Sequence, residues 1–180
     1  MASFHFEPLP ALARGDLDLV VTADPIPMSG IYYQPLFRYQ ALLAIANQHK
    51  LVDSKHVEAE DLADQTLIHY PVERKRLDIF TQFLEPKGIE PIGTRQADLT
   101  LMIVQLVASG RGVACLPNWA LQPYLNAGLI SSKPLGKSGV WPTLYAAIRE
   151  DQMDTSYMKD FLQQSLQACN ENLVGIEPVK

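Results

Sequence analysis

The stretch DLTLMIVQLVASGRGVACLPNW, residues 98–119, decides the fold that this sequence predicts. Its first half carries apolar residues at helical spacing and more on the opposite side, so we expect a helix covered on most of its circumference. Asp98 is placed to cap the start of this helix, and Gly110 and Gly112 permit the positive φ angles that end it. The short apolar run that follows, up to Pro117, indicates a buried strand. The helical repeat consists of Leu99, Met102, Ile103, Leu106 and Val107.

Short apolar runs bounded by turn residues predict most of the other strands. Residues 41–46, ALLAIA, fit a helix or a strand equally well by propensity, and residues 31–37 alternate weakly, as an edge strand does. Pro123 is expected to limit residues 119–126 to one or two broken helical turns. Strands that alternate with helices favour a parallel-rich α/β fold. The further strands expected are 17–21, 66–69, 91–96, 129–135 and 143–149, and the further helices are 8–14, 77–84 and 155–169.

Length and composition limit the classes of protein to consider. The chain has 180 residues, 47% of them apolar, and a formal net charge of -5. This length suffices for one domain or for two small lobes. An acidic chain without clustered Lys and Arg does not attract the phosphates of nucleic acids, so we expect only weak, non-specific DNA binding. No run approaches the roughly 20 apolar residues that span a bilayer, and two cysteines indicate a reducing compartment, the cytoplasm.

The residues that would carry catalysis or bind a metal are not assembled in the sequence. The four histidines are scattered and no Cys-x-x-Cys motif occurs, so we expect neither a metal nor a cofactor. Cys115 lies in an apolar run, where burial makes a thiol inert. The turn around Arg111 lacks the Lys-Ser/Thr of a phosphate-binding loop. No residue is therefore a clear candidate for a catalytic nucleophile, a general base or a metal ligand, and we do not expect an enzyme.

A ligand-binding site is the remaining possibility, at the points where predicted strands lead into helices. Helix N-termini there offer free N–H groups and a partial positive charge, which suit a carboxylate. Thr100 adds a hydroxyl, Arg95 a bidentate donor, and Trp119 and Tyr70 can wall an apolar part of the ligand. The alternative is that Thr100 and Asn118 only cap their helices. The expected site residues are Tyr70, Pro71, Val72, Arg95, Asp98, Thr100, Asn118 and Trp119.

Several stretches, in the same order, resemble the effector-binding domain of the LysR-type transcriptional regulators. They are LPALARGDLDLVV at 9–21, QPLF at 34–37, VASGRGVACLP at 107–117 and YAAIRED at 145–151, and the resemblance spans residues 6 to 166. Within that family, HYPVE at 69–73, RLD at 76–78 and LPNWAL at 116–121 are most similar to regulators of methionine biosynthesis.

The resemblance implies an α/β fold of two Rossmann-like lobes, similar to the type 2 periplasmic binding proteins. Lobe one would be residues 1–38 plus 150–180, and lobe two residues 39–149. The family's effector domain normally opens with a strand, a helix and a second strand, and this sequence starts near the end of that second strand. We therefore expect the first lobe to be incomplete at its N-terminus. The winged helix-turn-helix of the full-length regulators is not in this chain.

The function implied by the resemblance is that of a sensor in a regulator of methionine biosynthesis. Its effector would be homocysteine, and the sensor domains would pair as a homodimer. DNA would be bound only through a helix-turn-helix domain that this chain lacks. Two alternatives remain from the residues themselves: a solute-binding protein of the same fold for another small anion, and a small α/β enzyme. Substrate turnover would favour the enzyme.

Overall fold

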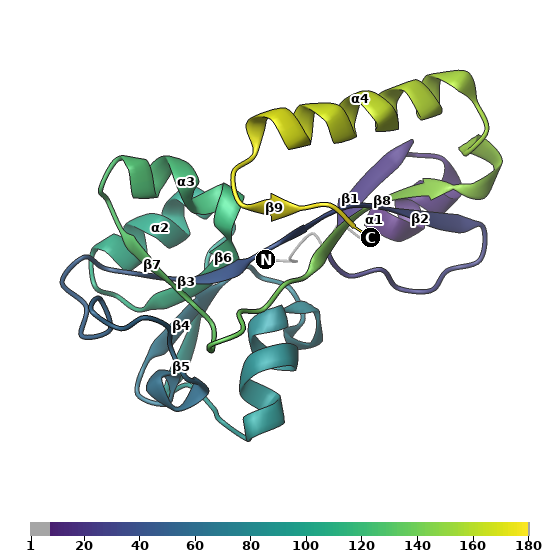
Figure 1. The fold of residues 1–180 in the computed structure, drawn as a ribbon. Helices are drawn as coiled ribbons and strands as arrows, with labels where there is room; N and C mark the ends of the chain where they lie inside the picture. Colours follow the sequence, from purple (N-terminus) through teal and green to yellow (C-terminus); the bar gives the residue numbers. More distant parts are fainter. Residues whose placement is uncertain (1–7, 180) are drawn as a thin grey trace. The chain divides into compact units, whose positions relative to one another are not determined.

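The computed structural model describes residues 8–179, which form two compact units (Figure 1). Of the described residues, unit 1 comprises 8–38 and 143–179, and unit 2 comprises 39–142. The second boundary lies earlier in the chain than the boundary at residue 149 that the sequence suggested. The reason is strand β8 (Thr143–Arg149), which pairs with two strands of unit 1, β1 (Leu19–Thr22) and β2 (Ile31–Tyr39).

Unit 2 is built on a mixed sheet of five strands in the order β5-β4-β6-β3-β7. Strand β4 runs parallel to both β5 and β6, whereas β3 runs antiparallel to β6 and β7. Residues 41–46, which fit either element by propensity, contribute a strand here because they pair on both sides. The strands are β3 (Ala41–Ile45), β4 (Thr66–His69), β5 (Gly93–Gln96), β6 (Val113–Pro117) and β7 (Ser131–Pro134).

Both faces of this sheet are covered by apolar side chains. Helices α2 (Thr100–Ala108) and α3 (Asn118–Asn126) lie on one face (Figure 1). On that face Ile103 and Val107 pack against Ile68. On the other face Phe80 and Leu84 pack with Leu43 of β3. The short helical segments of this unit are η1 (Ala59–Leu62), η2 (Arg74–Arg76), the π-helix η3 (Ile79–Leu84) and η4 (Glu85–Lys87).

The first turn of α2 differs from its prediction. Leu99, Leu101 and Met102 are each more than half exposed, so the helix is not covered on most of its circumference. Only one face of α2 lies against the sheet, and the side chains of its first turn point away from that face. Asp98 does not cap the helix either: the N-cap is Leu99, in an extended conformation, and it makes no side-chain capping hydrogen bond.

Helix α3 is continuous, contrary to the prediction of broken turns. Pro123 lies inside it and lacks the N–H that would bond to the carbonyl of Trp119. The helix nevertheless continues to Asn126, and its C-terminal end is closed by Ala127 N–H, which donates to the Pro123 carbonyl at 3.1 Å. Helix packing against β6 and β3 therefore outweighs the loss of one backbone hydrogen bond.

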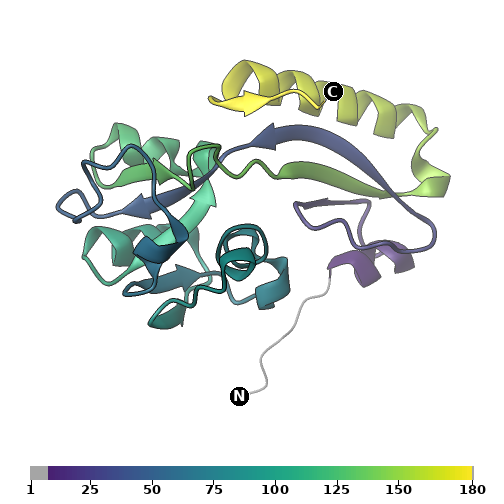
Figure 2. The same ribbon diagram turned by 60° about the horizontal axis from the view of Figure 1, so that its bottom comes forward.

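Unit 1 contains a second sheet with the strand order β1-β8-β2-β9. Strand β9 (Ile176–Glu177) borders β2, so β2 is an inner strand and the prediction of an edge strand is wrong. Helices α1 (Pro8–Arg14) and α4 (Ser156–Asn172) lie on opposite faces of this sheet (Figure 2). A short segment, η5 (Glu150–Gln152), leads into α4. Within residues 8–179, no helix combines the length and apolar character needed to cross a membrane.

Candidate functional site

Three neighbouring strands of the unit 2 sheet are parallel, so their carboxyl ends lie along the same end of the sheet. Strands β4, β5 and β6 all run in the same direction, so the residues that follow them lie at the same end of the sheet. In sheets of this kind, ligands bind outside the carboxyl ends of the strands. The residues proposed from the sequence lie within or directly after these strands: Tyr70, Pro71 and Val72 after β4, Arg95 in β5, Asp98 and Thr100 after β5, and Asn118 and Trp119 after β6.

Two of these residues are brought into direct contact. The Tyr70 hydroxyl lies 2.6 Å from Thr100 Oγ1, across a separation of 30 residues in the chain, and both side chains are partly buried. In a pair of hydroxyls only one hydrogen is used between them, because each group holds one donor and two acceptor lone pairs. The other hydroxyl hydrogen is therefore available to a ligand at the same point.

The amino end of α2 starts at this hydroxyl pair. Thr100 is the first helical residue rather than the cap, and its hydroxyl bonds to Tyr70 and not to the helix backbone. The first backbone bond of the helix runs from Ile103 N–H to the Leu99 carbonyl at 3.0 Å. The N–H groups of the first turn thus have no capping side chain, which is the arrangement that favours an anion.

The amino end of α3 contributes a buried donor. Asn118 N–H is bonded to the Gln40 carbonyl at 2.9 Å, which ties α3 to the start of β3. The indole Nε1 of Trp119 is buried, and no hydrogen-bond partner for it exists in the part of the chain that the structure describes. Leaving a buried donor unsatisfied costs about 1–3 kcal/mol, so an acceptor atom of a ligand would stabilise this site.

The other proposed residues are more peripheral. Pro71 and Val72 are exposed in a tight turn in which Val72 N–H donates to the Tyr70 carbonyl at 2.8 Å. Arg95 is exposed on β5, an edge strand, and Asp98 is exposed before α2. Neither of these two charged side chains has a hydrogen bond or ion pair among residues 8–179. The structure therefore brings Tyr70 and Thr100 together, whereas among the described residues it joins neither Arg95 nor Asp98 to them by a hydrogen bond.

A further polar residue at the same end of the sheet, Gln40, was not predicted from the sequence. Gln40 directly precedes β3, whose first residue pairs with the last residue of β6. A Cβ at Gly139 would lie 2.7 Å from Gln40 Nε2 and 2.9 Å from Trp141 Nε1, so these side chains would have to shift to admit it, and the φ of +74° independently favours glycine. The only local signal was a polar residue placed between two apolar runs, which by itself does not predict a site.

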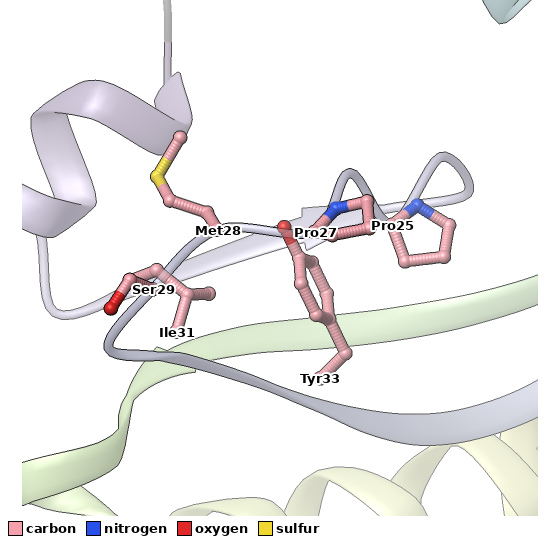
Figure 3. A pocket seen from close by; sticks show the side chains of 6 residues that line it. All are labelled: Pro25, Pro27, Met28, Ser29, Ile31 and Tyr33. Atoms are coloured by element: carbon pink, nitrogen blue, oxygen red, sulfur yellow. The ribbon is translucent and has the colours of Figure 1, made fainter.

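Unit 1 has an open groove of about 530 Å³ on the proline-rich loop that follows β1 (Figure 3). The Tyr33 hydroxyl donates to the Ile26 carbonyl at 2.5 Å, and burial together with the nearby Asp24 carboxylate raises the Tyr33 pKa. No charged side chain lines the groove, so it lacks a group that would bind a carboxylate. Its lining consists of Pro25, Pro27, Met28, Ser29, Ile31 and Tyr33.

The thiols and possible metal ligands do not form a second centre among the described residues. No group of three or more His, Cys, Asp or Glu side chains in residues 8–179 is placed to hold a metal ion. Burial, with a smaller contribution from Asp78, raises the Cys115 pKa to about 12. Burial also raises the pKa of Cys169. Because only the thiolate is nucleophilic, neither thiol is poised to react near neutral pH.

Known proteins with similar sequences share this domain. The family described as the LysR substrate binding domain matches residues 3–170. The HTH-type transcriptional regulator MetR of Escherichia coli strain K12 is 41% identical over 160 residues, covering 89% of this chain and 50% of that protein. MetR of Haemophilus influenzae is 36% identical over 176 residues, covering 98% of this chain and 57% of that protein. The chain spans about half the length of these curated relatives.

Solved structures extend the similarity to the fold. The regulatory domain of MetR, a LysR family regulator from N. meningitidis, superposes with a TM-score of 0.87 at 36% sequence identity. That superposition covers 99% of this chain and 82% of the other. Domains of this group have the type 2 periplasmic-binding-protein fold, which confirms the fold class expected from the sequence. The matched relatives are transcriptional regulators and not enzymes.

Proposed function

Because this chain belongs to the LysR substrate binding domain family and is similar to MetR, we propose that it senses a small amino-acid-like effector whose carboxylate binds at the amino end of α2. The observation that carries the proposal is the Tyr70–Thr100 hydroxyl pair, which lies at a helix start without a capping side chain. Hydroxyls and helix N–H groups together form a set of donors that matches a carboxylate.

The chemistry of unit 2 also favours an effector with a second acceptor and an apolar part. Trp119 Nε1 supplies a further buried donor, and the Tyr70 ring, which packs against the apolar cluster of α2 and α3, supplies an apolar wall. Homocysteine has a carboxylate and a short thiol-bearing chain, and it is the effector that we propose. The effector would alter the regulator only through its differential affinity for two conformations.

We further propose that the sensor acts as a homodimer in a cytoplasmic regulator of methionine biosynthesis, with DNA bound by a separate helix-turn-helix domain of the complete protein. Support for self-association comes from β5, which is an edge strand, and from Leu101 and Met102 of α2, which are more than half exposed. An open strand edge and exposed apolar side chains each favour pairing with another protein surface. Sedimentation at micromolar concentration should show a dimer that Met102→Glu weakens. A monomer throughout that range would contradict this.

The effector site is tested by calorimetric titration of the complete regulator with homocysteine, methionine and cysteine. Thr100→Val keeps the shape of the side chain but removes its hydroxyl, and hydrogen bonds to charged groups contribute about 1.5–3 kcal/mol. We expect homocysteine to bind about tenfold more weakly to this variant, since about 1.4 kcal/mol corresponds to one decade of affinity. Tyr70→Phe should have an effect in the same direction.

The matched control is Thr94→Val, which removes an exposed threonine hydroxyl from β5 and should leave the affinity unchanged. If Thr100→Val lowers the melting temperature but spares the affinity, the hydroxyl is only structural and the site lies elsewhere. Affinity of this chain equal to that of a longer sensor domain would indicate that unit 2 alone holds the effector.

A further inference from the structure

A connected set of contacts leads from the surface of unit 2 to the Tyr70–Thr100 pair. Its outer member is Arg74, at the start of η2. The guanidinium binds Glu90 with both terminal nitrogens, at 2.8 and 2.7 Å, and its Nε donates to Glu85 at 2.8 Å. Isolated exposed ion pairs contribute little to the stability of a protein, but a bidentate pair within a network contributes more. Arg74 is therefore held in one orientation.

The same guanidinium covers an aromatic ring. Its central carbon lies 4.1 Å from the centroid of Phe80, close enough for a cation–π interaction. Phe80 is only 2% exposed and belongs to the core on the η3 face of the sheet. The Arg74 side chain thus connects a charged surface cluster to a rigid core residue.

Phe80 in turn supports the residue that precedes Tyr70. The rings of Phe80 and His69 meet edge to face, with centroids 6.0 Å apart and planes at 88°. His69 Nδ1 lies 2.7 Å from the Tyr70 carbonyl oxygen. A carbonyl can only accept a hydrogen bond, so Nδ1 carries the hydrogen in this arrangement. The same oxygen also accepts from Val72 N–H, which fixes the Tyr70 peptide from two sides.

We infer that Arg74 is a positioning residue of the effector site, which acts through Phe80 and His69 to hold Tyr70 where its hydroxyl meets Thr100. This inference rests on the function proposed above, because its consequence is measured at the same site. Arg74 itself does not touch the effector. Its removal loosens the Tyr70 backbone, and the hydroxyl then spends less time at Thr100 and at the carboxylate of the effector.

The test is a double-mutant cycle measured by calorimetric titration of homocysteine into the complete regulator. Arg74→Gln should weaken binding about three- to tenfold, within the range for residues that act through a chain of contacts. In a Tyr70→Phe background the same substitution should change the affinity less than about twofold, because the hydroxyl through which Arg74 acts is gone. A merely destabilising change would weaken binding equally in both backgrounds.

Lys87→Gln is the matched control. Lys87 also pairs with glutamates, Glu58 at 2.9 Å and Glu60 at 3.7 Å, and lies 5.9 Å from the centroid of Phe83, but it contacts neither His69 nor Tyr70. Its substitution should not alter the affinity. If Arg74→Gln does not fold, Glu90→Gln removes the bidentate partner instead and should weaken binding in the same direction.

The outcomes separate the two proposals. Unchanged affinity in Arg74→Gln, additive losses in the double variant, or an equal loss in Lys87→Gln would overturn the role of Arg74 while the effector site stands. Unchanged affinity in both Tyr70→Phe and Thr100→Val would overturn the effector site, and the role of Arg74 with it.

Discussion

The two units of this chain bury their side chains to different extents. Unit 2 has an apolar cluster on each face of its sheet, and fully buried residues such as Leu43 and Ile68 form its centre. In the described part of unit 1 there is one small cluster, and its longest helix, α4, buries only Met158. The better-packed unit also carries the candidate site. A binding site needs a rigid platform, so we expect the stability of unit 2 to maintain the geometry of the hydroxyl pair.

The largest expected effect is the loss of a core side chain from unit 2. Leu43 in β3 is 0% exposed, and Leu43→Ala should lower the free energy of unfolding by about 2–5 kcal/mol. In unit 1, Phe161→Ala removes an α4 ring that is 55% exposed and should change stability by less than about 0.5 kcal/mol. Urea unfolding measures both. A comparable loss from Phe161→Ala would mean that the apolar side of α4 is covered in solution.

A pair of glycine variants sharpens the estimate of how tightly unit 2 is packed. A Cβ at Gly112, which has a φ of +152°, would lie 2.4 Å from the Thr66 carbonyl oxygen, whereas one at Gly110, with a φ of +68°, meets nothing. Gly112→Ala should therefore cost about 3 kcal/mol, from a clash with backbone and from strain. Gly110→Ala should cost about 1 kcal/mol, from strain alone. Equal shifts in melting temperature for the two variants would argue against close packing between β4 and β6.

Within unit 1, Arg149 provides a polar bridge between separate elements. Its Nη1 donates to the Leu17 carbonyl at 2.8 Å and to the Leu12 carbonyl at 3.2 Å, joining β8 to the α1–β1 turn. The side chain is only 20% exposed, so Arg149→Gln should cost about 1.5 kcal/mol. Arg14→Gln, which removes an exposed ion pair with Asp16, should be nearly neutral. Thermal unfolding that ranks these two variants in the opposite order would refute the bridge.

The smallest expected effect is acid sensitivity from the surface carboxylates of unit 2. Hydrogen bonds from Arg74 lower the Glu90 pKa, and hydrogen bonds from Lys87 and Lys50 lower those of Glu58 and Asp64. A carboxyl group whose pKa is lowered in the folded state stabilises the fold at pH values above its pKa in the unfolded chain. That contribution is lost as the pH falls through the pKa of the folded state. The melting temperature should fall slightly below a pH of about 4.5, and less so in Glu90→Gln. An unchanged acid profile in that variant would show that the pair contributes nothing.

Short-range features of the sequence predicted many elements correctly. The strand at 66–69 has the predicted bounds, and so does the strand at 143–149, because turn residues limit each apolar run. The positive φ angles of Gly110 and Gly112 were expected from a helix that must end before a strand. The motifs at 107–117 and 116–121 indicated a family that the comparisons confirm.

Properties that depend on distant parts of the chain were predicted less well. The compact unit 1 resumes at residue 143 and not at the expected residue 150, because β8 is assigned by its partners, β1 and β2, and not by its own residues. The exposure of Leu101 and Met102 depends on which face of α2 meets the sheet. Pro123 is tolerated because the tertiary packing of α3 outweighs a lost backbone bond.

The sequence by itself determined the order and type of most elements, the family, and the residues that lie at strand ends. These depend on periodicity and on backbone preferences that act within a few residues. Only the tertiary structure decided that Tyr70 and Thr100 meet, and that Phe80 contacts both Arg74 and His69. The contact between Tyr70 and Thr100 arises because β4 and β5, which precede these residues, pair in parallel. Such pairing is set by the combined burial of many side chains, which no local pattern records.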